Sequence, residues 1–276
     1  MGTVALDVQE RWNAGDRTVN SQLNWNSAGL CPVGRGVLDN TTFPGETWVN
    51  MTCASTDPVT GSSKRTEFAF GADYDPRLTD NQYYHFETYF KDYTADASSP
   101  NSCNHLVQQF KYGAYYPQLA LWVINQSGTL KFQVVRQVST TPDATTFETQ
   151  NTHIIGNVPS NTKQVWDYDI LWREDNTGHI KIYINGTIVL NLTGIQTMDE
   201  PANPANPPIP KFRMGPYCFG GFNSITSRTI FYRRVIIGNN DFADFNAFQT
   251  YINGSNPLPP PTEDNTNTVQ GIFINE

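Results

Sequence analysis

Short segments in which polar and apolar residues alternate, separated by turn-forming residues, constrain the fold of this chain more than any other feature. In residues 64–70, Phe68 and Phe70 fall on one face of an extended strand while Arg65 and Glu67 fall on the other, because successive side chains of a strand point to opposite sides. Comparable segments recur at short spacing, at residues 83–90, 105–112, 119–124, 130–138, 165–173, 179–184, 187–192, 211–217 and 229–237. Many short strands joined by turns predict an all-β sandwich or jelly roll of two packed antiparallel sheets.

The composition agrees with a chain of strands and turns. Of the 276 residues, 13% are aromatic and 16% are charged, and no long stretch rich in Ala, Leu, Glu and Lys is present. Strands are therefore favoured over helices, and only residues 241–251 suggest one short helix. The length suits one large domain, which we place at residues 1–256. Residues 257–276 form a tail rich in Pro, Asn and Thr that we expect to be mobile.

Several functional classes lack their sequence signatures in this chain. It has no Gly-x-Ser-x-Gly, P-loop, dinucleotide-binding or His-Glu-x-x-His pattern, and its four histidines are too scattered for a three-histidine zinc site. A net charge of −8 argues against nucleic acid as a partner. No run of about 18 apolar residues occurs, so we expect no membrane partner. We also expect a monomer.

Sequons and cysteines favour an exported, secreted protein. Six Asn-X-Ser/Thr sequons occur, and the four cysteines are an even number without metal-like spacing. Two disulfides are expected, with Cys31–Cys53 and Cys103–Cys218 favoured among three connectivities, and four buried thiols are the alternative. No signal-peptide pattern is visible, and the first methionine is interpreted as a start codon placed before a mature sequence.

Three strand segments carry polar groups on one face. Arg65 and Glu67 stand two residues apart on the first, and an exposed face with an ion pair is the simpler explanation. Residues 211–217 place Lys211, Arg213 and Tyr217 on one face, where the side-chain-free Gly215 leaves room in which a sugar ring would fit. A basic surface strand is the alternative for this segment.

The remaining segment lies at residues 105–111. Alternation places Gln109 and Lys111 on one face together with His105, while Leu106 and Phe110 point to the core. A solvated sheet face would have the same pattern.

Taken in order, the three segments resemble motifs of the jelly-roll polysaccharide lyases: alginate lyases, the heparin lyase I type and, most closely, glucuronan lyases (polysaccharide lyase family 20). Alginate lyases of this architecture carry Arg-Ser-Glu-Leu, then Gln-Ile-His or Gln-Val-His, then Tyr-Phe-Lys-x-Gly-x-Tyr. The counterparts here are Arg-Thr-Glu-Phe at 65–68, Gln-Phe-Lys at 109–111 and Lys-Phe-Arg-Met-Gly-Pro-Tyr at 211–217. The resemblance covers about residues 60–240, and the sequence departs from it where Lys111 replaces the histidine and Arg213 replaces the lysine.

The resemblance implies a concanavalin A-like jelly roll with a concave substrate groove. It also implies an enzyme that degrades an acidic polysaccharide, a β-1,4-linked uronate polymer with glucuronan foremost, by β-elimination. Catalysis of this kind requires no cofactor. Some relatives bind a structural calcium ion, for which Asn239, Asn240 and Asp241 offer oxygen ligands.

The same resemblance assigns roles to four residues. The proton on C5 of a uronate is too weakly acidic while the neighbouring carboxylate is charged, so a lyase must neutralise that carboxylate. Arg65 and Gln109 are expected to do so, with Arg213 or Lys111 beside them. Tyr217 is expected to act as base and acid; because a phenol ordinarily has a pKa of about 10, this role requires nearby cations.

The missing motif histidine bears on the substrate. In glucuronate and mannuronate the C5 hydrogen and O4 lie on the same side, so one tyrosine serves a syn elimination, whereas an anti elimination conveniently uses two groups. The sequence therefore favours a gluco- or manno-configured substrate, in agreement with the resemblance to glucuronan lyases, unless His85 or His105 reaches the site from elsewhere. Substrate contacts are further expected from Glu67, Lys111, His105, His85, Lys211, Tyr112 and Tyr115, with Tyr116 and Trp48 as additional stacking candidates.

Three alternatives remain open. An alginate (mannuronate) lyase of the same fold would share these motifs, and a non-catalytic, lectin-like carbohydrate-binding module would share the fold without needing the convergent Arg, Gln and Tyr. A glycoside hydrolase would require two carboxylates in the groove. Glu67 is available for that role, but no Glu-x-Asp-x-x-Glu pattern accompanies it.

Overall fold

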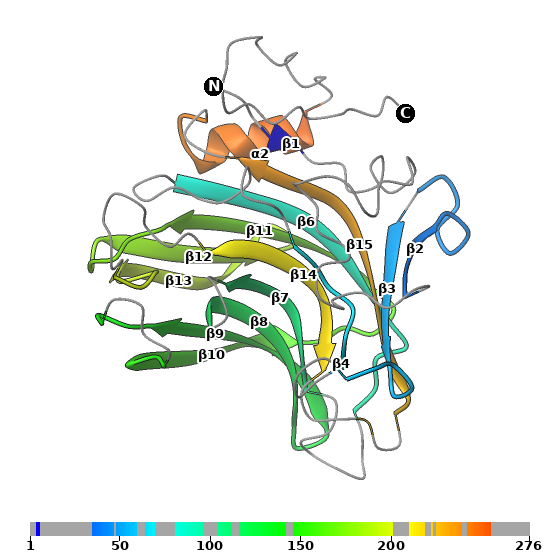
Figure 1. Cartoon of the computed structure of the whole chain (residues 1–276). Helices are drawn as coiled ribbons and strands as arrows, with labels where there is room; N and C mark the ends of the chain where they lie inside the picture. Colours follow the sequence, from blue (N-terminus) through cyan, green and yellow to red (C-terminus); the bar gives the residue numbers. More distant parts are fainter. Residues whose placement is uncertain are drawn as a thin grey trace.

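The computed structural model of the chain shows a two-layered β protein (Figure 1). It describes residues 4–5, 35–46, 48–59, 64–69, 81–95, 104–111, 116–141, 146–200, 210–218, 222, 225–238 and 242–254. The predicted tail at 257–276 lies outside these residues, as do Tyr112, Tyr115 and the three calcium-ligand candidates at 239–241. In the part that is described, no helix is long and apolar enough to cross a membrane.

Two antiparallel sheets contain the strands. The larger, called the outer sheet here, has the order β13 (Thr187–Ile195), β12 (Gly178–Ile184), β11 (Lys163–Leu171), β6 (Asn81–Lys91), β15 (Ser227–Gly238), β3 (Trp48–Ala54) and β2 (Gly36–Asp39), with β1 (Val4–Ala5) beside β15. The inner sheet has the order β10 (Thr149–Asn157), β9 (Thr129–Val138), β8 (Pro117–Gln126), β7 (His105–Lys111), β14 (Lys211–Cys218) and β4 (Lys64–Arg65), with β5 (Phe68–Ala69) also beside β14.

The two sheets curve in the same direction, and the inner sheet is nested inside the arc of the outer one (Figure 1). The predicted all-β jelly roll of two packed sheets is thereby confirmed. The inner sheet's far face lies on the inside of the curve, and we call it the concave face. A substrate groove on this face stays a prediction.

Alternating aromatic residues fill the space between the sheets. Tyr84 and Phe86 point inward from β6, and Phe110 and Phe212 meet them from β7 and β14, with ring centres 4.8 Å apart for Tyr84 and Phe110 and 6.1 Å apart for Phe86 and Phe212. All four are fully buried. Burial of one such side chain contributes roughly 2–3 kcal/mol, so this core fixes the register of both sheets and the placement of every side chain on their outer faces.

The predicted helix is present as α2 (Phe245–Asn253), which covers the far face of the outer sheet (Figure 1). The carboxylate of Asp244 accepts a hydrogen bond from the backbone N–H of Ala247 and caps the first turn. Phe248 of α2 stacks on Tyr83 of β6, which points away from the core.

The cysteine prediction is corrected in part. Cys53 is a buried free thiol, so the favoured Cys31–Cys53 disulfide is wrong. It shares the strand face of Val49 and Met51, which places its sulfur in the core. Cys218 is also buried, and Cys31 and Cys103 lie outside the described residues.

Candidate active site

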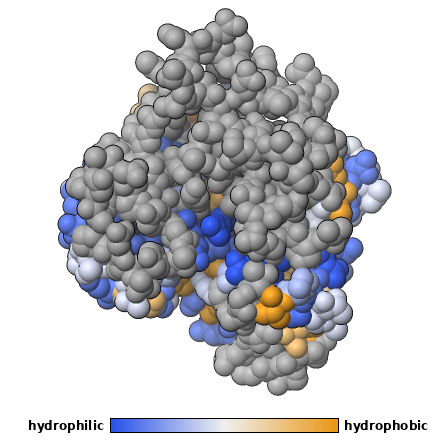
Figure 2. All heavy atoms as spheres, viewed as in Figure 1, coloured by the Kyte–Doolittle hydropathy of each residue, from blue (hydrophilic) through white to orange (hydrophobic). Residues whose placement is uncertain are grey.

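The three predicted segments meet on the concave face because β4, β14 and β7 are neighbours. In the strand pairing, Tyr217 stands opposite Arg65 and Arg213 stands opposite Gln109. Four residues that are far apart in sequence thus share one patch, which we call the Arg65–Tyr217 cluster. Figure 2, viewed as Figure 1, shows strongly hydrophilic residues over the middle of this face, where Figure 1 draws β7 and β14.

A chain of polar contacts links Tyr217, Arg65 and Gln109 of the cluster through Glu67. The Nη2 atom of Arg65 donates to Oη of Tyr217 at 2.8 Å, and the guanidinium carbon lies 3.9 Å from the centre of the tyrosine ring. On its other side, Nη1 of Arg65 lies 3.6 Å from Oε2 of Glu67. Oε1 of Glu67 accepts from Nε2 of Gln109 at 2.5 Å. One connected network is therefore formed by Tyr217, Arg65, Glu67 and Gln109.

The charge of this patch is positive. Arg65, Lys111 and Arg213 surround one carboxylate, Glu67, whose pKa is raised by burial despite the nearby cations. Burial lowers the pKa of Lys111, and the charges of Arg213 and Arg65 lower it further. Burial likewise lowers the pKa of Arg213, and the Nε atom of Arg213 is buried without a hydrogen-bond partner among the described residues. Such desolvated cations favour an anionic ligand.

A β-bulge in β7 overturns part of the predicted pattern. The pairing with β8 shifts by one residue between Leu106 and Gln108, so the residues before the bulge face opposite to the simple alternation. Leu106 therefore points to the concave face, where it packs with Tyr217. His105 points inward, is fully buried, and bonds through Nε2 to the hydroxyl of Tyr93 at 3.0 Å. The prediction that His105 contacts substrate is wrong for this reason.

Gly215 has a different function from the one predicted. Its φ of +126° is a conformation that residues with side chains rarely adopt, and a Cβ there would lie 2.0 Å from the carbonyl oxygen of Thr66. The space beside Gly215 is thus filled by the backbone between β4 and β5, and is not open to a sugar ring. Thr66 is held there by a hydrogen bond from its N–H to the carbonyl of Pro216 at 2.9 Å.

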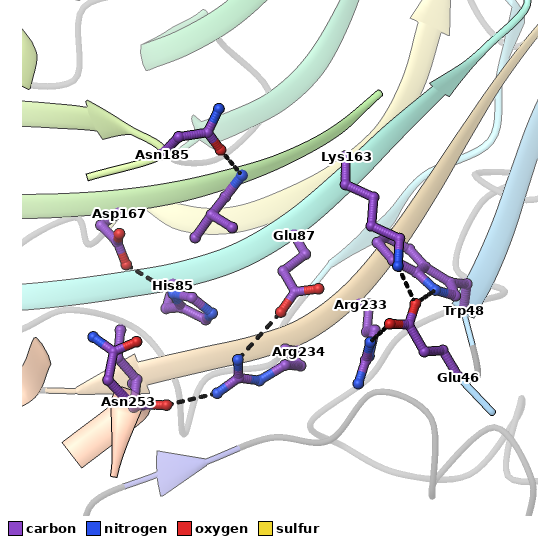
Figure 3. A network of polar contacts seen from close by, with 12 residues as sticks. Glu46, Trp48, His85, Glu87, Lys163, Asp167, Asn185, Arg233, Arg234 and Asn253 are labelled. Carbon is purple, nitrogen blue, oxygen red and sulfur yellow. Dashed lines mark hydrogen bonds and ion pairs between the residues drawn. The ribbon is translucent and has the colours of Figure 1, made fainter. Parts of the chain in front are cut away.

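His85 lies on the far side of the molecule. It points outward from β6 in the outer sheet, away from the core, where its Nδ1 is 2.7 Å from Oδ1 of Asp167 (Figure 3). The imidazole is buried, and the whole core separates it from the Arg65–Tyr217 cluster. His85 therefore does not contact a substrate bound at that cluster, contrary to the prediction.

Two other stacking candidates are also occupied elsewhere. Trp48 is fully buried on the outer sheet, where its Nε1 donates to Glu46 at 2.9 Å (Figure 3). Tyr116 donates to Asp199 at 3.0 Å.

The backbone of Lys211 stands opposite Lys111, and its side chain is not part of the described structure. Within the described residues, no group of three His, Cys, Asp or Glu side chains could hold a metal ion.

Trp122 was missed by the sequence reasoning. It stands opposite Leu106 in the β7–β8 pairing and packs, half-buried, against the apolar group of Leu106, Ala120 and Tyr217 on the concave face. The signal was present in the alternation of residues 119–124, which puts Leu121 on the core side and Trp122 on the other. A large aromatic residue on a polar sheet face could have been recognised as a binding residue.

The chain is similar to known families and structures. A family model described as "Polysaccharide lyase" matches residues 12–235. No curated protein matches the chain. A solved endo-β-1,4-glucuronan lyase from the fungus Trichoderma reesei shares 19% identity at a TM-score of 0.58, covering 78% of this chain and 91% of that one. The alginate lyase Aly36B shares 13% identity at a TM-score of 0.55, covering 86% of this chain and 96% of that one.

The fold is shared beyond these lyases. The catalytic domain of a glycoside hydrolase family 131 protein from Coprinopsis cinerea shares 17% identity at a TM-score of 0.54, covering 86% of this chain and 94% of that one. At such identities, a similar structure establishes the fold and leaves the reaction to the family match and the site.

Proposed function

Because the chain belongs to the polysaccharide lyase family, we propose that it cleaves a β-1,4-linked polyuronate, glucuronan in the first place, by syn β-elimination at the Arg65–Tyr217 cluster. In this reaction the C5–H bond and the C4–O4 bond of a uronate break. A C4–C5 double bond forms, the C5 proton goes to the enzyme, and O4 leaves with a proton.

The observation that carries the proposal is the convergence of cations, an amide and a tyrosine on one sheet face. Removal of the C5 proton places negative charge on the neighbouring carboxylate, and donors aimed at that charge lower the barrier. Gln109 and Arg213 stand opposite each other in adjacent strands and supply an amide and a guanidinium for this purpose. Lys111, two residues further along β7, adds a third donor.

Tyr217 is the residue that we assign to both proton transfers. Its hydroxyl oxygen accepts a hydrogen bond from Arg65, so a fixed positive charge stands beside the oxygen when it loses its proton. His85 and His105, the histidines considered as a second catalytic group, both lie away from the cluster. One tyrosine acting alone suits a syn elimination, which glucuronate and mannuronate allow.

Glucuronan ranks ahead of alginate on two grounds. The syn geometry excludes guluronate blocks as the preferred substrate, and the three motifs resemble those of glucuronan lyases most closely. The similar structures include both an endo-β-1,4-glucuronan lyase and alginate lyases, which leaves mannuronate polymers as the second candidate.

The test compares four polymers: glucuronan, polymannuronate, polyguluronate and heparin. Each is incubated with the protein, and the absorbance of unsaturated uronate ends is followed together with the release of reducing ends. We expect the fastest rise in absorbance with glucuronan and a slower one with polymannuronate. Reducing ends without absorbance would instead indicate hydrolysis, and neither signal on any polymer would indicate a carbohydrate-binding module.

A further inference from the structure

Glu67 is the one buried carboxylate of the polar network that links Gln109, Arg65 and Tyr217. We propose that Glu67 is a positioning residue: it holds the side-chain amide of Gln109 and the guanidinium of Arg65 in the orientation that the elimination needs. This inference rests on the proposed function, and it replaces the prediction that Glu67 itself binds substrate.

Charge and contacts both disfavour direct contact between Glu67 and a uronate. The carboxylate of Glu67 would repel that of the sugar, and its two oxygens already face Gln109 and Arg65. Glu67 and Gln109 are each 1% exposed, whereas Arg65, Lys111 and Arg213 are each half-buried and reach the surface. Glu67 lies between β4 and β5, next to Thr66, whose backbone approaches Gly215 closely. Its carboxylate is therefore placed behind the groups that face the solvent.

An ionised carboxylate can only accept hydrogen bonds, and this fixes the orientation of the Gln109 amide. The amide must turn its NH₂ group toward Oε1 of Glu67, which lies 2.5 Å from Nε2. One N–H is used in this contact, and the second remains to donate to a uronate carboxylate. With no carboxylate at position 67, the amide could turn over and present its oxygen to the substrate's own negative charge.

The same carboxylate orients Arg65. One terminal nitrogen of the guanidinium, Nη1, lies 3.6 Å from Oε2 of Glu67, while the other, Nη2, donates to Tyr217. Since the guanidinium is planar, attraction at one nitrogen restricts the direction of the other. Glu67 thereby acts on the proton-transfer residue through one intermediate side chain.

A double-mutant cycle tests whether Glu67 acts through Gln109. The variants are Glu67→Gln, Gln109→Ala and their combination, with kcat and KM measured on the best polyuronate. We expect Glu67→Gln to lower kcat roughly 10- to 100-fold, as for other residues that orient a site, with KM changed less than about threefold. In the Gln109→Ala background the same substitution should cost at least fivefold less, because its target is gone. Equal losses in both backgrounds would overturn the role.

The pH profile distinguishes positioning from a structural role. The charged and titratable groups around Glu67 include Arg65 on β4, Lys111 on β7, Arg213 and Tyr217 on β14, and the buried Tyr232 on β15. As the pH falls through its raised pKa, Glu67 gains a proton, becomes a donor and no longer fixes the amide. Activity of the wild type should therefore fall on the acid side, and Glu67→Gln should lose this limb. Glu67→Asp, which keeps the charge, should keep it.

A measurement that needs no activity separates this proposal from the function. The Gln109 side-chain NH₂ resonances, assigned by their loss in Gln109→Ala, should shift with the ionisation of Glu67 in the wild type and stay constant in Glu67→Gln. If all four polymers are left intact, the proposed function fails, yet this titration still decides the contact. Resonances that do not respond to pH in the wild type would overturn the positioning role even in an active lyase.

Discussion

At the scale of single residues, the proposed mechanism depends most on Tyr217. Its ring packs with Leu106 and Ala120 and its hydroxyl faces Arg65, so Tyr217→Phe removes the reacting oxygen and leaves the packing. We expect kcat to fall roughly 10²- to 10⁴-fold, with KM and the melting temperature nearly unchanged. The assay is the absorbance of unsaturated uronate ends, and a variant that keeps most of its activity would remove Tyr217 from the reaction.

Trp122 allows a second test at this scale. An indole beside the cluster can cover one face of a sugar ring, on the order of 50 Å² of apolar surface, which at about 25 cal/mol/Å² changes KM roughly eightfold. We expect Trp122→Ala to raise KM by this factor while kcat changes little. Trp122→Phe is the matched control and should recover part of the affinity. An unchanged KM in the alanine variant would place the sugar elsewhere on the sheet.

The cluster itself could be predicted from the sequence, and its surroundings could not. Arg65, Gln109, Arg213 and Tyr217 were found because the order of three short motifs is independent of the exact strand geometry. His85 was misjudged because alternation says which side of a strand a residue faces, but not which sheet contains the strand. That information comes from the pairing of distant strands, which one sequence does not show.

At the scale of elements, β-bulges limit how well side-chain directions can be predicted from the sequence. Simple alternation holds along β6, where Tyr84 and Phe86 both face the core. In β7 one bulge reverses the faces of His105 and Leu106, and nothing in the residue types announces it. The positions of the strands were therefore predicted more reliably than the directions of their side chains.

Gly215 is the residue on which the shape of the edge strand depends. Gly215→Ala would place a methyl group 2.0 Å from the Thr66 carbonyl oxygen and force an unfavourable φ, so we expect a loss of about 3 kcal/mol or more in unfolding free energy. Gly186→Ala is the control, since its φ of +75° is also positive but no atom lies within 4 Å of the added group. That variant should lose only about 1 kcal/mol.

Urea unfolding of the two glycine variants provides the comparison. We also expect Gly215→Ala to lose activity at temperatures where it remains folded, because the shift of Thr66 moves the neighbouring Arg65 and Glu67. Equal stability losses for the two variants would mean that the β4–β5 segment relaxes around the methyl group. The close approach of Thr66 to Gly215 would then contribute nothing to stability.

At the scale of the whole molecule, the charge of the site opposes that of the protein. The chain carries a net charge of −8, yet Arg65, Lys111 and Arg213 gather on one face. The excess of acidic residues thus says little about the substrate, since interactions between exposed charges are largely screened beyond about 8 Å at physiological salt. Net charge argues against nucleic acid as a partner more strongly than it argues against a polyanionic sugar.

Buried charges should also make the free energy of unfolding depend on pH. The pKa values of two buried carboxylates, Asp169 and Glu67, are shifted in opposite directions. Burial alone would raise the pKa of Asp169, but hydrogen bonds from His179 and Lys181 outweigh it and lower the pKa. Asp169 therefore contributes stability above the pKa of the unfolded chain, and this contribution is lost as the pH falls through its lower native pKa. For Glu67 the native pKa is raised, so ionisation weakens the folded state at neutral pH.

Asp169→Asn and Glu67→Gln should consequently behave as opposites. At pH 7 we expect Asp169→Asn to lose about 1–3 kcal/mol of unfolding free energy, and the difference from the wild type should shrink as the pH falls below about 4. Glu67→Gln should be as stable as the wild type or more so at pH 7, despite its lower activity. Denaturant unfolding at several pH values measures both. A clear loss of stability in Glu67→Gln at neutral pH would contradict this expectation. The attraction between the carboxylate and its cationic neighbours would then exceed the cost of burying the charge, and the network around Arg65 would mainly stabilise the fold.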